Sequence, residues 1–210
     1  MVFVGFGVYI LGCGSPKLVV SYRQTAEEQA ASGNYIQAVE AWKMHFAQQG
    51  IENVQGNEFA EAARTAWKAG DHTQAVAWYD QARYKQFSSE EMYSTLANIF
   101  HKSDNLSKEM DALEYYVQNF TLQTDSVYGR LYGIYVETGN TDKAKDAWMK
   151  MDNRSRDRLE NLESWFRINK NLGDTALCDS VSLIILEKDP VHVSSLEWNA
   201  QKYYQRAENR

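Results

Sequence analysis

The side chains best suited to metal binding or nucleophilic catalysis lie too far apart along this sequence to form a recognised motif. Two cysteines, Cys13 and Cys178, lie near opposite ends of the chain, so they form no Cys-x-x-Cys zinc or redox pair. No histidine has a second metal ligand at the spacing of a helical His-Glu-x-x-His motif. The four histidines are His45, His72, His101 and His192.

Motifs for phosphate binding and acid–base catalysis are absent as well. Gly5 and Gly7 form a Gly-x-Gly, but this lies in an apolar stretch rather than between a strand and a helix. The sequence contains no Gly-x-Ser-x-Gly. The adjacent acids Glu27-Glu28 and Glu90-Glu91 would point to different sides of a helix, so they do not form a carboxylate pair. We therefore predict that the chain is not an enzyme and uses no metal or cofactor.

Cys13 is the one reactive residue with a distinctive context. It follows an apolar run from Met1 to Leu11, which is too short for a membrane span of about 20 residues. The run has the length of a signal-peptide apolar region, roughly 7–15 residues. No basic residue precedes Lys17, whereas signal peptides normally open with Lys or Arg. A buried apolar segment with an ordinary cysteine is the alternative.

The small residues around Cys13 resemble the lipobox of bacterial lipoproteins. In that family the chain is cut before the cysteine, which then carries the lipid. The resemblance implies a signal segment at residues 1–12, lipidation of Cys13 and a tether at residues 13–20. It places the protein in the bacterial cell envelope, anchored to the outer membrane. The absence of acidic residues close after Cys13 favours the periplasmic side over the cell surface.

Composition describes an acidic, folded chain. Apolar residues make up 44% and charged residues 24%, which is typical of a globular protein rather than a disordered one. A net charge of -6 argues against a surface-wide nucleic-acid interface, which needs clustered Lys and Arg, so we predict no nucleic-acid partner. The only prolines are Pro16 and Pro190, so nothing between them need break a helix.

A repeated pattern runs through most of this proline-free stretch. It consists of Gly, then Asn or Asp, then a small residue five positions after the Gly and a large residue four positions later. Gly139 and Gly173 are 34 residues apart. Gly70 lies about twice that distance before Gly139. The four segments are Gly33 with Ala38 and Trp42, Gly70 with Ala75 and Tyr79, Gly139 with Ala144 and Trp148, and Gly173 with Cys178 and Ser182, the last of which keeps the small residue but lacks the large one.

A 34-residue period is typical of the tetratricopeptide repeat, a helix-turn-helix unit, and the chain resembles that family. Leu186 to Pro190 is similar to the end of a family repeat. The resemblance implies an all-α right-handed superhelix of antiparallel helix pairs, with about five repeats and a terminal helix over residues 21–210. Cys178 takes the small-residue position, so we predict a buried, inert thiol.

The expected helices follow from this register. The third repeat lacks glycine, and its turn, Ser103 to Lys108, is about three residues too long for the pattern. The expected ranges are 20–32, 35–49, 57–69, 72–86, 89–102, 107–120, 125–138, 141–151, 155–171, 174–187 and 192–208.

In the resembled family, the first helices of the repeats line a concave groove. Counting from each glycine, and from Asp104 in the third repeat, places several cations, an aromatic and polar residues on that groove. The predicted partner-binding residues are Arg64, Trp67, Lys68, Asn98, His101, Lys102, Arg130, Arg167 and Lys170. Other groove positions are Asn57, Ala60, Glu61, Glu91, Ser94, Thr95, Ser126, Gly129, Gly133, Val136, Glu137, Glu160, Glu163, Ser164 and Asn171.

The leading hypothesis is a scaffold or adaptor, anchored to the membrane at Cys13, that binds a protein or an acidic peptide in this groove. Ordinary solvated charges are the alternative for the groove residues, because several glutamates lie among them. Two other functions stay open. One is a glycan- or small-ligand-binding lipoprotein of an uptake system. The other is a structural subunit of an outer-membrane assembly complex that uses its convex face.

Overall fold

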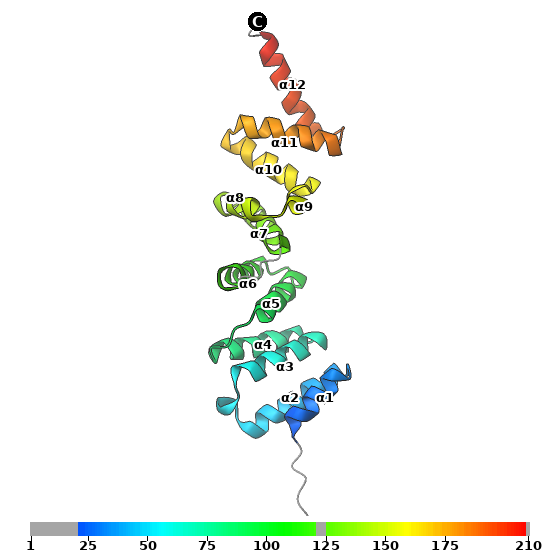
Figure 1. The fold of residues 1–210 in the computed structure, drawn as a ribbon, viewed down its shortest axis with the longest axis vertical. Coiled ribbons are helices and arrows are strands. Elements are labelled where there is room, and N and C mark those ends of the chain that lie inside the picture. The colour runs from blue at the N-terminus through cyan, green and yellow to red at the C-terminus, as the bar shows by residue number, and fades with distance from the viewer. Residues whose placement is uncertain (1–20, 121–124, 209–210) are drawn as a thin grey trace, which may run out of the picture. The chain divides into compact units, whose positions relative to one another are not determined.

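The computed structural model describes residues 21–120 and 125–208 (Figure 1). Within these ranges the regular structure consists of twelve α-helices and one short 3-10 helix, without a strand. No helix among the described residues is both long and apolar enough to cross a membrane. The predicted signal segment, Cys13 and the tether lie outside the described residues.

The chain divides into two compact units, residues 1–87 and residues 88–210. In each unit, helices adjacent in sequence pack as antiparallel pairs (Figure 1). The first unit contains α1 (Tyr22–Ala31), α2 (Tyr35–Gln49), the 3-10 helix η1 (Ile51–Asn53), α3 (Gly56–Lys68) and α4 (His72–Tyr84). The second unit contains α5 (Glu90–Lys102), α6 (Leu106–Asn119), α7 (Asp125–Glu137), α8 (Thr141–Lys150), α9 (Asn153–Arg156), α10 (Leu159–Leu172), α11 (Thr175–Lys188) and α12 (Val193–Glu208).

The turn inside each pair is built from a left-handed residue followed by a helix cap. The repeat glycines have φ between 71° and 83°, a conformation that costs glycine least. The Asn or Asp that follows begins the second helix. At Asp71, for example, the side chain accepts a hydrogen bond from the Gln74 amide at 3.0 Å, which satisfies an otherwise unpaired helix N–H.

The third turn corrects the sequence prediction. Asp104 has φ of 51° and takes the place of the missing glycine, since Asp tolerates the left-handed region better than most residues. Asn105 then caps α6 through the Lys108 amide at 3.2 Å. The turn therefore ends at Asn105 and has the same form as the others, so the expected extension to Lys108 is wrong.

The small residues of the pattern lie at the centres of the pairs. Ala38, Ala75 and Ala144 are completely buried, as is Cys178. The large residues four positions later are buried with them, and Trp42 and Tyr79 are each 1% exposed. The predicted burial of Cys178 is confirmed, and burial raises the pKa of its thiol, which keeps the unreactive thiol form.

One predicted helix, 155–171, is two helices in the structure. Asp152 caps α9 through the Ser155 amide at 2.8 Å, and Arg158 then leaves helical geometry with ψ of 137°. The Asn161 side chain donates to the Ser155 carbonyl at 2.8 Å, so this carbonyl is satisfied without a continuous helix. Beyond the break, Trp165 stacks on Trp148 with ring centroids 4.7 Å apart.

A buried carboxylate joins three helices of the first unit. Glu58, near the start of α3, accepts from the Gln55 amide at 3.0 Å. It also lies 3.1 Å from His45 of α2 and from Arg23 of α1. Burial alone would raise the pKa of Glu58, but the bonds from Gln55 and His45, together with Arg23, outweigh it and lower the pKa.

This network predicts a specific pH dependence of stability. Because the pKa of Glu58 is depressed in the folded state, its stabilisation is present above the unfolded value near about 4.3 and is lost as the pH falls through the folded value. Replacing Glu58 with Gln should lower the free energy of unfolding by about 1 kcal/mol at pH 7. Urea unfolding from pH 7 to pH 3 measures this difference, which should narrow below pH 4. A constant difference over that range contradicts the assignment.

Candidate functional site

Two hollows in the second unit lie on either side of α7. The α5–α7 hollow has a volume of about 660 Å³, and the α7–α10 hollow has about 690 Å³. Ser89, Glu90, Glu91, Ser94, Asn98, Leu113, Tyr116, Val127 and Arg130 line the first. Tyr132, Gly133, Val136, Glu137, Gly139, Thr141, Glu160, Asn161, Ser164, Arg167, Ile168 and Asn171 line the second.

These hollows are shaped by first helices, as the repeat register predicts. More than half of the residues lining the α7–α10 hollow were counted as groove positions from sequence. The Tyr132 hydroxyl of α7 donates to the Asn161 carbonyl of α10 at 3.3 Å, which joins the two walls. Burial raises the pKa of Tyr132 above its ordinary value, although Arg167 nearby opposes this. The hydroxyl therefore stays protonated and able to donate.

Two glycines leave parts of the α7 surface without a side chain, and one of them, Gly133, lines the α7–α10 hollow. Gly129 and Gly133 are four residues apart and so lie on the same helix face. A Cβ added at Gly133 would have no atom within 4 Å. At Gly129 it would meet only Ser155, at 3.9 Å. The open surface at these positions comes from the missing side chains, because no neighbouring group fills the space.

Arg130 lies between α5, α6 and α7, where it holds a buried carboxylate. Its guanidinium donates to Glu109 at 2.6 and 3.0 Å, and the side chain of Glu109 is only 2% exposed. The same guanidinium donates to Asn98 at 2.9 Å and to the Ala97 carbonyl at 3.1 Å. Arg130 is therefore committed to bonds within the chain.

Two of the predicted partner-binding residues, Arg130 and His101, contact this carboxylate, and a third, Asn98, accepts from Arg130. The His101 ring lies 3.0 Å from Glu109, with its side chain 68% exposed. Lys102 follows on α5 and is exposed. The α5–α7 hollow also has an acidic edge, where Glu90 accepts from Tyr116 at 2.5 Å. Burial and this bond raise the pKa of Tyr116 to about 12, so the hydroxyl stays protonated.

The cation of the α7–α10 hollow is Arg167. It is exposed, and it forms no ion pair within residues 21–120 and 125–208. Lys170, one turn further along α10, lies over the Trp198 ring with its ammonium 5.9 Å from the centroid. Of these two predicted site residues, Arg167 lines the hollow and Lys170 packs toward α12.

The remaining predicted residues lie on α3 in the first unit. Arg64 is 3.7 Å from Glu61, on the same helix. The Lys68 ammonium lies 5.6 Å from the centroid of the Tyr35 ring, and Trp67 is partly buried. The structure thus places these three residues together, and separately the Asn98, His101 and Arg130 group. Binding of a partner by any of them stays a prediction.

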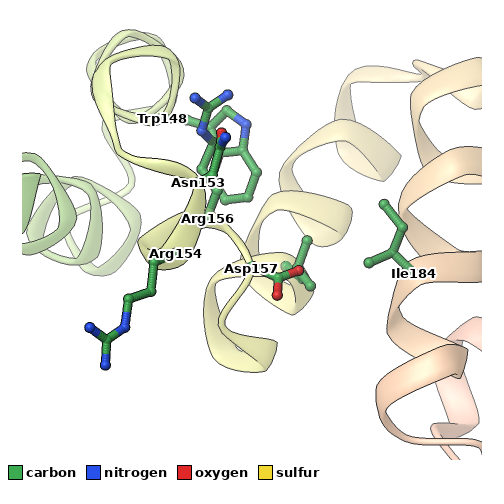
Figure 2. Close-up of a pocket in the computed structure, with 7 residues that line it drawn as sticks. Trp148, Asn153, Arg154, Arg156, Asp157 and Ile184 are labelled. Atoms are coloured by element: carbon green, nitrogen blue, oxygen red, sulfur yellow. The ribbon is translucent and has the colours of Figure 1, made fainter.

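A third hollow was not foreseen from the sequence. It has a volume of about 630 Å³ and lies between the short helix α9 and α11 (Figure 2). Figure 2 shows Asp157 and Ile184 facing each other across it, with Arg154 directed away. Asp157 is paired with Lys188 at 2.8 Å. The hollow lies beside the break between α9 and α10, since Arg156, Asp157 and Leu162 line it.

Glu109 is the functional-site neighbour that sequence reasoning missed. An isolated glutamate near a helix start normally indicates a favourable dipole interaction or a solvated face. Only its position four residues after the capping Asn105 places it on the inner side of α6. Neither the burial nor the pairing with Arg130 carries a sequence signal of its own.

Comparison with known proteins supports the fold. No family model and no curated relative match the chain. The crystal structure of MamA protein aligns with a TM-score of 0.57 at 18% identity, over 87% of this chain and 92% of that one. YrrB, a TPR protein with an unusual peptide-binding site, aligns with a TM-score of 0.59 at 10% identity, over 86% and 90%.

A third solved structure agrees. The C-terminal part of a TPR repeat-containing protein from Cytophaga hutchinsonii aligns with a TM-score of 0.51 at 14% identity, over 84% of this chain and 86% of that one. At such identities the likeness concerns the fold alone. The predicted all-α, tetratricopeptide-repeat-like fold is confirmed.

The Arg130 network predicts that this residue stabilises the folded state. Replacing Arg130 with Met leaves the buried Glu109 without its main countercharge, which should lower the free energy of unfolding by about 3 kcal/mol. Replacing both Arg130 and Glu109 with Met should recover most of that loss, because no buried charge remains. Urea unfolding measures both. Arg167→Met is the matched control and should change stability by less than about 0.5 kcal/mol. Equal effects at Arg130 and Arg167 would sink the assignment.

Proposed function

We propose that this protein is a non-catalytic, protein-binding scaffold and that its second unit holds an extended peptide segment of the partner against α7. The observation that carries the proposal is the pair of hollows on either side of α7, one of which is lined by Gly133, where no neighbouring atom fills the space of a side chain. A hollow of 660–690 Å³ has the size of a ligand site. Two adjacent ones suit a ligand that extends from one to the other.

The chemistry of the walls favours a peptide. Amide and hydroxyl side chains line both hollows, including Asn98 and Ser94 in one and Ser164 and Asn171 in the other. Such groups donate to and accept from main-chain amides without requiring a particular sequence. Val136 and Ile168 supply apolar contacts in the α7–α10 hollow. This mixture resembles the polar and apolar balance of protein interfaces.

The charge preference that we propose centres on Arg167. Because Arg130 is committed to Glu109, it offers less to a ligand than its charge suggests. Arg167 has no such commitment among the described residues and lines the α7–α10 hollow. A carboxylate of the partner would form a charge-assisted, two-point bond with it. An acidic side chain next to a small apolar residue is therefore the expected partner motif.

A glycan-binding role receives less support from these walls. Sugar binding would need aromatic faces open to the hollow. The aromatics that line the two hollows, Tyr116 and Tyr132, are 4% and 1% exposed, so their rings are covered. A role as a structural subunit through the convex face is the second alternative, and it would leave the hollows unused.

We further propose that the scaffold is lipid-anchored at Cys13 in a bacterial outer membrane, facing the periplasm. The support is the sequence alone: an apolar run ending in a cysteine between two glycines. An anchor at that position would hold the repeats near the membrane through the short tether.

The peptide proposal is tested by filling the hollow at Gly133. Gly133→Trp should weaken binding of a peptide selected from a display library on the wild-type chain by at least about tenfold, because a buried large side chain displaces the ligand. The fold should tolerate the change, since nothing lies within 4 Å of the added Cβ. Fluorescence anisotropy of the labelled peptide gives the dissociation constants.

Two control variants distinguish a blocked binding site from a destabilised fold. Met149→Trp adds the same ring on α8, where the native side chain is 70% exposed and outside both hollows. It should bind the peptide as the wild type does. Gly133→Ala should raise the free energy of unfolding by about 0.5–1 kcal/mol through helix propensity. Unchanged affinity in Gly133→Trp would contradict the proposed site.

The anchor has its own test. When the full chain is expressed in a bacterial host, the wild type should fractionate with membranes and take up a radiolabelled fatty acid. Cys13→Ala should lose the label and leave the lipidated membrane fraction. Absence of label from the wild type would exclude the lipid anchor while leaving the peptide proposal intact.

A further inference from the structure

The hollow between α9 and α11 contains a positive charge that the fold leaves unpaired. Arg156 is half-buried and lines this hollow. Its Nε is buried and has no hydrogen-bond partner, and within the described residues its guanidinium forms no ion pair. A buried donor without an acceptor destabilises a fold, so such a group in a folded chain needs a physical reason.

Other partly buried cations of the second unit each have a carboxylate as partner. Arg130, with its side chain 29% exposed, pairs with Glu109 at 2.6 Å. Lys188, with its side chain 32% exposed, pairs with Asp157 at 2.8 Å. A countercharge of this kind makes the loss of water around a cation tolerable. Arg156 lacks one in the part of the chain that the structure describes, so an anion from outside this chain would fit beside it.

A second polar side chain lies on the same face of α9. Asn153 and Arg156 are three residues apart, which places them on one side of the helix, and both line the hollow. The Asn153 amide has no hydrogen-bond partner among residues 21–120 and 125–208. The amide and the guanidinium are both donors, so together they suit the two oxygens of a carboxylate. Arg154 is directed away from this pair (Figure 2).

The rest of the hollow is mainly apolar. Trp148 of α8, Leu162 of α10 and Ile184 of α11 line it. Figure 2 shows Trp148 and Asn153 on one wall and Ile184 on the other. Ile184 is 38% exposed, so its side chain has surface left for a ligand to cover. The volume of about 630 Å³ lies in the range of small-molecule sites.

We propose that this hollow is a binding site for a small carboxylate that carries an aromatic or other apolar body. Arg156 and Asn153 bind the carboxylate through charge-assisted hydrogen bonds. The apolar body lies against Trp148 and Ile184, where it is removed from water.

The charges around the hollow favour a carboxylate over a phosphate. Asp157 also lines the hollow, but its pairing with Lys188 neutralises it. One unpaired guanidinium therefore remains on the wall, and it balances a single negative charge. A phosphate monoester carries about 1.5 to 2 negative charges at pH 7, which Arg156 alone does not balance.

NMR spectroscopy of the full chain tests the site with 3-phenylpropionate as the probe. The Trp148 indole N–H resonance, assigned with Trp148→Phe, should shift saturably, with a dissociation constant on the order of 0.1–1 mM. The neutral amide of the same acid, 3-phenylpropanamide, should bind at least about tenfold more weakly, because it lacks the charge. No saturable shift, or equal affinity for acid and amide, overturns the proposal.

Two arginines of the same short helix provide a matched pair of variants. Arg156→Met should weaken binding of 3-phenylpropionate by at least about tenfold, whereas Arg154→Met should bind as the wild type does, since Arg154 is directed away. Because no described residue accepts from Arg156, its replacement should not lower the urea midpoint. Equal losses in the two variants indicate a general charge effect and overturn the site.

Two further variants test the location without removing a charge. Ile184→Trp narrows the hollow from the α11 wall and should weaken binding of 3-phenylpropionate by at least about tenfold. Gly133→Trp should leave that binding unchanged, because Gly133 lines a different hollow. An effect of Gly133→Trp with none of Ile184→Trp places the acid in the α7–α10 hollow and overturns the proposal.

The source of the carboxylate is decided by a second probe. The capped peptide acetyl-Gly-Asp-Phe-Gly-amide presents a carboxylate beside an aromatic ring, as a protein partner would. Tighter binding of this peptide than of 3-phenylpropionate, with the same loss in Arg156→Met, assigns the site to a protein-borne carboxylate. Weaker binding assigns it to a free acid. A peptide that binds equally well to the wild type and to Arg156→Met lies elsewhere and excludes the protein-borne source.

Discussion

Close approach of the two helices in each pair is the constraint on which this structure depends. It is set by single small residues: Ala38, Ala75 and Ala144, with Cys178 in their place in the last pair, have no exposed surface. A larger side chain at such a centre would push the helices apart, and close-packed interiors tolerate little added volume. In the α7–α8 pair, the large aromatic four residues later, Trp148, stacks on Trp165 of the next pair. The outer faces of the first helices are then left to form hollows.

Buried carboxylates provide a second layer of organisation between the pairs. Glu58 joins α1, α2 and α3, and Glu109 joins α5, α6 and α7. Glu114, which is only partly buried, does the same for α6, α7 and α8, accepting from Tyr135 at 2.8 Å and Lys143 at 2.7 Å. Each acid receives more than one donor, which is what makes a buried charge tolerable. Some basic side chains near the groove are therefore engaged in ion pairs that hold the fold together. The number of positive charges at groove positions is larger than the number that a ligand could contact.

The repeat register made most of the fold predictable, because a glycine, a cap and a small residue at fixed spacing report local geometry directly. The same register gave wrong predictions where residues outside the pattern determine the local backbone geometry. Asp104 adopts a left-handed conformation without being glycine. At the break between α9 and α10, the Asn161 side chain donates to the Ser155 carbonyl, a bond that no spacing rule indicates. For the candidate site, the register identified some of the positions that line the hollows. It gave no account of Arg130, since its partner Glu109 lies on another helix and is buried only in three dimensions.

At the two glycines of α7, the residue type has a low helix propensity although the backbone is helical. Each glycine inside a helix costs about 1 kcal/mol relative to alanine, so a fold-related reason should be visible if one exists. At Gly56 it is visible, because a Cβ there would lie 2.5 Å from the Cβ of Phe87. Gly133 has no such neighbour, and Gly129 has only an ordinary contact. Packing therefore explains the first glycine and leaves the other two unexplained. Positions where a sequence works against its own fold are expected to be functional or strained sites, and one of these two, Gly133, lines the α7–α10 hollow.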